Sequence, residues 1–161
     1  MSEKDPLTKA IELFQQAYQY QMNGQLDLAI EFYKRSIEAY PTAEAYTFLG
    51  WTYSFQGKLR EAIAECKKAI DTDPDFGNPY NDIGAYLIEL GNYDEAIPWL
   101  ERATLAKRYE PRHYPHFNLG RVYLIKGMVK KALEEFQKAL EIYPDYPAAK
   151  ETVDKLKYTL N

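Results

Sequence analysis

The chain has 161 residues, of which 46% are hydrophobic and 27% charged, a balance that allows one domain with a sizeable core. Its net charge of -4 argues against a nucleic-acid partner, because nucleic-acid-binding proteins favour a basic surface. No stretch approaches the roughly 18 uninterrupted apolar residues of a membrane span, so we expect no membrane insertion.

The first segment, "MSEKDPLTKA", carries both charge signs and no apolar run, so it does not resemble a secretory signal. The one cysteine, Cys66, cannot form an internal disulfide and fits a reducing compartment. We therefore expect a cytoplasmic protein. Asp5 followed by Pro6 predicts the N-cap and the first residue of an opening helix.

Four similar segments then follow one another, each with two blocks that predict helices. Apolar residues recur every three or four positions among Glu, Lys, Leu and Ala. The first blocks are "QAYQYQMNG" (16–24), "LGWTYSFQG" (49–57), "IGAYLIELG" (83–91) and "LGRVYLIKG" (119–127). One alanine marks the register of each second block: Ala29, Ala62, Ala96 and Ala132. Their spacings of 33, 34 and 36 residues indicate an internal repeat of helix pairs.

The helix ends are marked by glycine and proline. A glycine closes each first helix, where a left-handed C-cap favours glycine, and a proline stops three of the second helices. These residues are Gly24, Gly57, Gly91 and Gly127, with Pro41, Pro74 and Pro144.

The third repeat departs from this pattern. Instead of a closing proline, "LAKRYEPRHYPH" inserts two extra residues, which predicts a longer loop before the fourth repeat. Pro98 lies inside a predicted second helix and should kink it. We interpret both as local irregularities and not as a domain boundary.

The last segment, "PAAKETVDKLKYTL", predicts a helix that closes the stack. Ala149, Val153, Leu156 and Leu160 form one apolar stripe, and the opposite face carries Lys and Glu. A stack of repeats needs such an end unit with a polar outer face.

In this register the sequence resembles the tetratricopeptide-repeat family over residues 10–146. The second repeat carries the family pattern at Tyr46, Leu49, Gly50, Tyr53, Ala62, Ala69 and Pro74, and the fourth at Leu119, Gly120, Tyr123, Ala132, Phe136, Ala139 and Pro144. The resemblance implies an all-α fold, a right-handed α-solenoid of antiparallel helix pairs, in a single domain over 1–161. The repeats are expected at about 10–42, 43–76, 77–110 and 113–146, and the capping helix at about 147–160.

The resemblance also implies that the first helices line a peptide-binding surface. Phe48, Trp51 and Phe55 share one helix face at i, i+3 and i+7, and with Phe14 and Tyr18 they would form an aromatic wall. Amides both donate and accept hydrogen bonds, so Asn81 and Asn118 could pin a peptide backbone, and Arg121 could bind a carboxylate. We expect a non-catalytic protein–protein interaction module, such as an adaptor, scaffold or co-chaperone, with a protein or peptide partner and no cofactor.

Other interpretations of the aromatic residues stay open. They could pack as extra core, lie under the first residues of the chain, or close a homodimer. A self-associating scaffold could use this groove or the capping helix. Binding of chaperone C-termini by a two-carboxylate clamp, known in the family, is not supported. The matching positions hold Phe14, Tyr18, Phe48, Asn78 and Asp82, which supply no cation.

Catalytic and metal chemistry find little support. His113 and His116 have a spacing that can chelate a metal, with Glu110 near, yet zinc sites usually have three or four ligands. We therefore predict no metal site. Cys66 is expected to fill the core, because a reactive thiol needs exposure and a positive environment.

The residues around the inserted loop form a small basic cluster. Lys107, Arg108 and Arg112 lie there with the two histidines. We expect a solvated surface, with an anionic or phosphorylated partner as the alternative.

Overall fold

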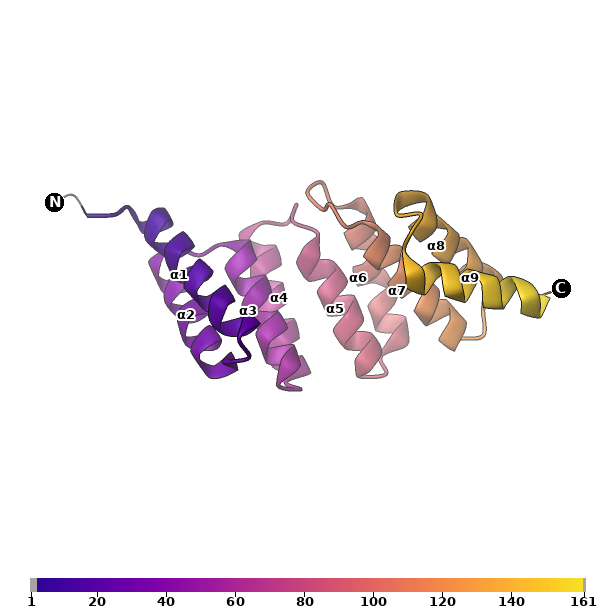
Figure 1. Cartoon of the computed structure of the whole chain (residues 1–161), viewed down its shortest axis with the longest axis horizontal. Helices are drawn as coiled ribbons and strands as arrows, with labels where there is room; N and C mark the ends of the chain where they lie inside the picture. The colour runs from indigo at the N-terminus through magenta and orange to yellow at the C-terminus, as the bar shows by residue number, and fades with distance from the viewer. Residues whose placement is uncertain (1–2, 161) are drawn as a thin grey trace.

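A computed structural model describes residues 3–160 of the chain. This part is all-α, as predicted, and its nine helices follow one another along the long axis of the molecule (Figure 1). The helices are α1 (Pro6–Met22), α2 (Leu26–Ala39), α3 (Ala43–Phe55), α4 (Leu59–Thr72), α5 (Asn78–Glu89), α6 (Tyr93–Leu105), α7 (His113–Ile125), α8 (Val129–Ile142) and α9 (Pro147–Leu160).

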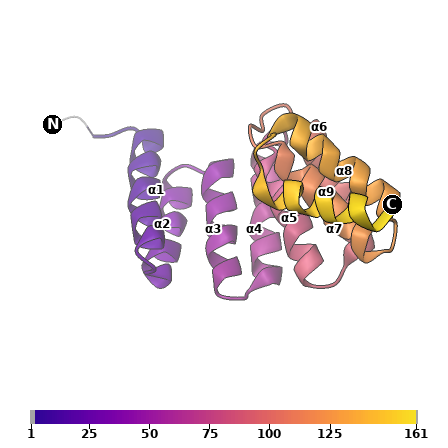
Figure 2. The ribbon, with the colours of Figure 1, turned by 45° about the vertical axis from the view of Figure 1, so that its right-hand side comes forward.

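The helices pack as hairpins that stack on one another. The two helices of each pair, α1 with α2 through α7 with α8, are joined by three residues, and each pair also packs on the next one. The first helices of successive pairs also touch, since α3 contacts α5 and α5 contacts α7. These three helices therefore share one face of the stack. Figure 2 shows the succession from a second side. The architecture is an α-solenoid, which confirms the predicted fold class.

The glycine prediction is confirmed. Gly24, Gly57, Gly91 and Gly127 have φ between 76° and 80°, the left-handed region where a side chain would be strained. At the first of them, the backbone N–H of Gly24 donates to Gln21 O at 3.0 Å, and Gln25 N–H donates to Tyr20 O at 2.9 Å. This pair of bonds closes the helix and turns the chain back toward α2.

The other predicted helix ends also appear. Asp5 caps α1 by accepting a hydrogen bond from the backbone N–H of Thr8 at 3.0 Å, and Pro6 is the first helical residue. The helices α2, α4 and α8 end two residues before Pro41, Pro74 and Pro144. α6 is continuous through the exposed Pro98, so this proline does not divide the helix.

The core lies between the helices of each pair and between neighbouring pairs. The register alanines Ala29, Ala62, Ala96 and Ala132 are fully buried. Cys66 is also fully buried, as predicted, and burial raises the pKa of its thiol well above the usual value. It packs with Ile83, Leu87 and Leu100 in the central cluster of the core.

The closing helix differs from the prediction in one position. α9 buries Ala149, Val153 and Leu156, but Leu160 is exposed, so the apolar stripe is one residue shorter than predicted. The reason is geometric, since α9 packs mainly on α8 and is the last helix of the described part. Within that part, no helix is long and apolar enough to cross a membrane.

Candidate functional site

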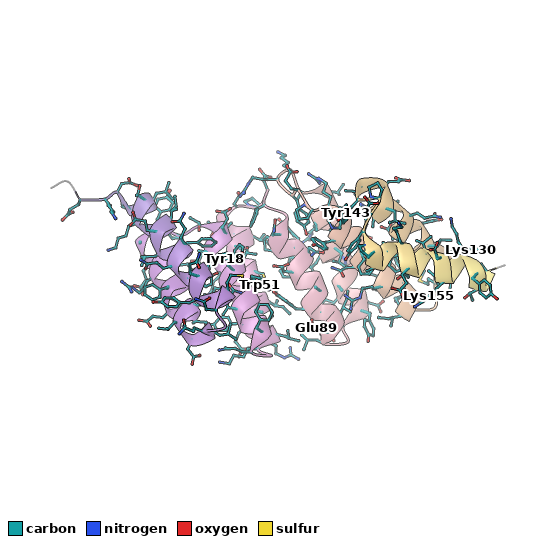
Figure 3. The ribbon with its side chains drawn as sticks, viewed as in Figure 1. Tyr18, Trp51, Glu89, Lys130, Tyr143 and Lys155 are labelled. Carbon is teal, nitrogen blue, oxygen red and sulfur yellow. The ribbon has the colours of Figure 1, made fainter. Side chains whose placement is uncertain are left out.

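The five predicted aromatic residues on α1 and α3 lie in contact with one another. The ring of Phe48 is 5.1 Å from that of Phe14, 6.0 Å from Tyr18 and 5.7 Å from Trp51, measured between centroids. The rings of Trp51 and Phe55 are 4.9 Å apart. Figure 3 labels Tyr18 and Trp51 on their neighbouring helices. We call these five residues the aromatic wall.

One part of the aromatic wall extends the core and the other part faces solvent. Phe14 and Phe48 are half-buried against Tyr33, with ring centroids 5.5 Å and 6.2 Å away, and Tyr33 is fully buried. Tyr18 and Phe55 are 38% and 56% exposed. Phe14 and Phe48 thus pack against the core, while Tyr18 and Phe55 expose part of their rings to solvent.

The three predicted polar residues are joined in one hydrogen-bonded chain. The Nδ2 atom of Asn118 on α7 donates to Oδ1 of Asn81 on α5 at 3.0 Å. Nη1 of Arg121 donates to Oδ1 of Asn118 at 3.1 Å. Both asparagines are buried, so these bonds fix their side chains and align α5 with α7.

A cavity of about 410 Å³ lies beside the aromatic wall. It is bounded by α3, α5, the 106–112 loop that precedes α7, and the start of α7 itself. Its lining residues are Thr47, Phe48, Trp51, Asn78, Asn81, Asp82, Tyr109, Pro111 and Tyr114. Three of the predicted site residues, Phe48, Trp51 and Asn81, therefore border one hollow surface.

Tyr109 and Pro111 are lining residues that the sequence analysis did not select. The 106–112 loop folds back onto the α4–α5 connection, where Arg108 N–H donates to Asp75 O at 2.9 Å and Gly77 N–H donates to Arg108 O at 3.0 Å. These bonds set the buried Tyr109 beside Gly77. The two-residue insertion was the available signal for this loop.

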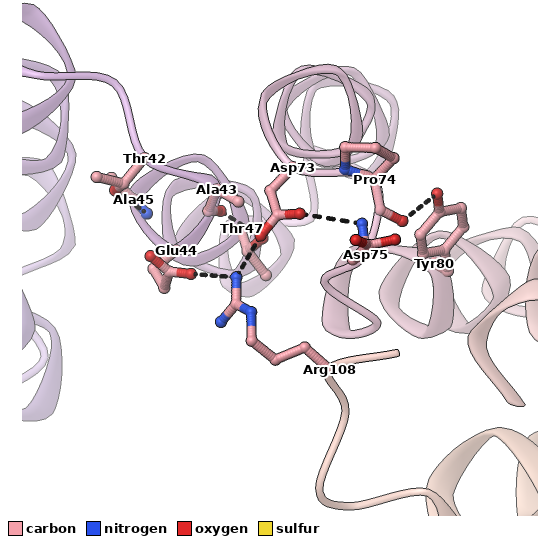
Figure 4. A network of polar contacts seen from close by, with 10 residues as sticks. All are labelled: Thr42, Ala43, Glu44, Ala45, Thr47, Asp73, Pro74, Asp75, Tyr80 and Arg108. Atoms are coloured by element: carbon pink, nitrogen blue, oxygen red, sulfur yellow. Dashed lines mark hydrogen bonds and ion pairs between the residues drawn. The ribbon is translucent and has the colours of Figure 1, made fainter. Parts of the chain in front are cut away.

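The side chain of Arg108 fixes the same loop (Figure 4). Its Nη2 atom lies 3.0 Å from Glu44 Oε1 and 2.6 Å from Asp73 Oδ2, and its guanidinium lies 4.4 Å from the ring centroid of Phe76. The hydrogen bond from Arg108 is the main reason that the pKa of Asp73 is lowered. Arg108 thus joins α3, α4 and the loop.

The expected basic cluster is largely engaged within the chain. Besides the ion pairs of Arg108, the guanidinium of Arg112 donates to the carbonyl oxygens of Thr104 at 3.0 Å and Ala106 at 2.5 Å. The two arginines therefore act as structural ties of the loop, which weakens the alternative of an anion-binding surface there.

Asp82 differs from the other lining residues in its charge. It is half-buried on α5, and burial raises the pKa of its carboxyl to about 7. No hydrogen bond or ion pair within residues 3–160 satisfies this carboxylate, whereas Asp73 has Arg108 as a partner. A carboxylate that is partly removed from water and has no partner is energetically costly.

The comparisons with known proteins agree with this architecture. Models described as tetratricopeptide repeat match residues 13–43, 43–76 and 75–145, which together cover the four helix pairs. The chain belongs to the tetratricopeptide-repeat family.

Among curated relatives, the Protein SGT1 homolog of Oryza sativa subsp. japonica is 37% identical over 81 residues, covering 50% of this chain and 22% of that protein. The type IV pilus assembly protein PilF of Pseudomonas aeruginosa is 28% identical over 130 residues, covering 80% of this chain and 52% of PilF. The chain therefore spans about a fifth and about half of the length of these two relatives.

Solved tetratricopeptide-repeat structures superpose closely. The structure of Pseudomonas aeruginosa PilF has a TM-score of 0.90 at 25% identity, covering 97% of this chain and 71% of that one. YrrB, described as a TPR protein with an unusual peptide-binding site, has a TM-score of 0.70 at 25% identity, covering 94% and 78%.

The two histidines of the fourth tetratricopeptide repeat have separate surroundings. His116 Nδ1 lies 2.8 Å from Glu135 Oε2. His113 lies among the rings of Tyr114, Tyr143 and Tyr146, 4.1 to 5.1 Å between centroids, and burial lowers its pKa. The described residues contain no group of three or more His, Cys, Asp or Glu side chains that could hold a metal ion.

Proposed function

We propose that this chain is a non-catalytic adaptor or scaffold that binds a peptide segment of a partner protein along α3, α5 and α7. The single observation that carries the proposal is the combination of a partly exposed aromatic wall with an adjoining cavity on one face. Exposed aromatic residues beside a hollow surface are typical of protein interaction sites.

Each predicted site residue has a role in this proposal. Tyr18, Trp51 and Phe55 supply large contact area and lose little rotamer entropy on binding. The remaining N–H groups of the Arg121 guanidinium can donate to a carboxylate or carbonyl oxygen of the peptide. Asn81 borders the cavity, where its Nδ2 group can donate to the peptide backbone, while its Oδ1 atom already accepts from Asn118.

The comparisons support a peptide as the ligand. Tetratricopeptide repeats are generally interaction modules, and YrrB is described as having a peptide-binding site. A co-chaperone role is one form that such binding could take. We propose the cytoplasm as the compartment, because Cys66 is a free thiol and fits a reducing environment.

A selection from a phage-displayed random peptide library on the purified chain tests the proposal. We expect bound peptides whose affinity falls at least about tenfold, about 1.4 kcal/mol, in Trp51→Ala and in Phe55→Ala. Tyr158→Ala is the matched control, because Tyr158 is 86% exposed on α9, far along the stack from the aromatic wall. Circular dichroism verifies that each variant is folded. Equal affinity for the wild type and the wall variants would refute the proposal.

A second candidate is a self-associating scaffold, which the exposed apolar side chains of α9 favour. Tyr158 and Leu160 both lie exposed on its last turn. Light scattering at increasing concentration tests this candidate. A mass that rises with concentration and returns to the monomer value in Leu160→Lys supports it, and a monomer at all concentrations contradicts it.

A further inference from the structure

Aromatic rings border the cavity from three separate elements. Phe48 and Trp51 come from α3, Tyr109 comes from the 106–112 loop, and Tyr114 comes from the first turn of α7. The face of an aromatic ring carries negative charge and attracts a cation that lies over it. Rings that surround one hollow from several sides are therefore suited to a positively charged group.

Asp82 adds a negative charge to the same lining when its carboxyl is ionised. The other residues that line the cavity are aromatic, amide, hydroxyl or proline side chains, so Asp82 is the one charged residue among them. No lysine or arginine of residues 3–160 lies within ion-pairing distance of its carboxylate, and burial alone accounts for its raised pKa. The charge in the cavity is thus uncompensated within the described chain.

The neighbouring arginines are committed elsewhere. Arg108 pairs with Glu44 and Asp73, and Arg112 binds backbone carbonyl groups. Because these contacts also hold the 106–112 loop in place, neither side chain can turn to Asp82 without releasing a wall of the cavity. No lysine or arginine of residues 3–160 is paired with Asp82, so its carboxylate is open to a cationic ligand.

We propose that the cavity is a specificity pocket for a lysine or arginine side chain of the bound peptide, with Asp82 as its counter-ion and Phe48, Trp51, Tyr109 and Tyr114 as its aromatic walls. This inference rests on the proposed peptide-binding function and names the chemistry that the partner must carry. A volume of about 410 Å³ holds such a side chain together with part of its backbone.

The pocket should be sensitive to pH. The titratable groups that face Asp82 are the Cys66 thiol from α4 and the hydroxyls of Tyr86 on α5 and Tyr109 on the loop, with Tyr114 from α7 on the same lining. Burial raises the pKa of the first three groups, so they are neutral near pH 7. Asp82 is then the group that titrates, and the affinity for a cation should fall as the pH is lowered from 8 to 6.

The indole N–H signal of Trp51 in two-dimensional NMR reports directly on this pocket. The probes are N-acetyl-arginine amide and its neutral isostere N-acetyl-citrulline amide, titrated at pH 8. Trp99, assigned through a Trp99→Phe variant, is the internal control, because it does not line the cavity. We expect a saturable shift of the Trp51 signal with the arginine probe and at least about tenfold weaker binding of the citrulline probe.

Two single substitutions test whether binding depends on the charge of the pocket or on its shape. Asp82→Asn keeps the shape of the pocket and removes its charge, and we expect the affinity for the arginine probe to fall at least about tenfold. Asp71→Asn removes the same charge from an exposed site on α4 that does not line the cavity, and it should bind as the wild type does.

The outcomes distinguish this inference from the proposed function. Equal binding of both probes, no binding of the arginine probe, or unchanged binding by Asp82→Asn would each overturn the cation pocket. Peptides selected on the chain would still bind through the aromatic wall in that case. If no peptide is selected but the arginine probe binds through Asp82, the proposed cation pocket is supported and the proposed binding of an extended peptide is refuted.

Discussion

The carboxyl group of Asp82 lies where burial disfavours its charged form. Its pKa is about 7 in the folded chain, while an unperturbed aspartate has a value of 3.8. Between these values the folded state binds more protons than the unfolded state, so the unfolding free energy contributed by Asp82 decreases as the pH rises from about 4 to about 7. A residue that destabilises the fold at neutral pH and borders a cavity is a candidate for a binding role.

We predict that Asp82→Asn gains stability while it loses affinity for a cation. Asp82→Asn should raise the unfolding free energy at pH 8 by about 1–2 kcal/mol, because one pKa unit corresponds to about 1.4 kcal/mol and partial exposure reduces the effect. At pH 4 the gain should vanish, since the wild-type carboxyl is then protonated. Urea unfolding of both proteins at the two pH values measures the difference. A variant that is less stable at pH 8 would contradict the argument.

The shared helix face of the aromatic residues could be predicted from the sequence, but the burial of Phe48 could not. The spacing of Phe48, Trp51 and Phe55 is a local property of one helix, so their common face could be predicted. That Phe48 is half-buried depends on Tyr33, which comes from a different helix pair, and the sequence pattern carries no signal for this contact.

At the scale of an element, the 106–112 loop is the feature that distinguishes this chain from a regular stack of repeats. Its length could be predicted from the two-residue insertion. Its position could not, because it depends on the backbone bonds to Asp75 and Gly77 and on the ion pairs of Arg108 with helices far away in the sequence. This loop supplies Tyr109 and Pro111 to the lining of the cavity.

Gly77 provides a test of how closely the loop is packed. A Cβ atom at this position would lie 2.5 Å from Cβ and Cγ of Tyr109, so the tyrosine must move. We expect Gly77→Ala to lower the unfolding free energy by about 1–3 kcal/mol and to weaken binding of the arginine probe. Denaturant unfolding and the NMR titration measure these two effects.

Arg108→Ala is the companion variant for the same loop. The Arg108 side chain is 54% exposed, and exposed ion pairs contribute little to stability. We therefore expect Arg108→Ala to lower the unfolding free energy by less than about 1 kcal/mol. A larger loss in Arg108→Ala than in Gly77→Ala would mean that the ion pairs, and not the packing of Tyr109, hold the loop.

For the whole molecule, the stacking of four helix pairs follows from signals that recur in each repeat. Each pair contacts mainly its neighbours. The glycine and proline ends and the register alanines predicted the helix pairs, and the resemblance to the tetratricopeptide-repeat family predicted how the pairs stack. The hydrogen-bonded chain of Asn81, Asn118 and Arg121 depends on how α5 and α7 are aligned. The three residues could be selected individually from the family register, but their contacts could not be predicted.

Amide chemical-shift changes in the ¹⁵N-labelled chain on addition of a selected peptide show which helices bind the partner. We predict that the largest changes fall on α3, α5, α7 and the 106–112 loop, because these elements border the aromatic wall and the cavity. Changes concentrated on α2, α4, α6 and α8 would place the partner on the opposite face and contradict the account.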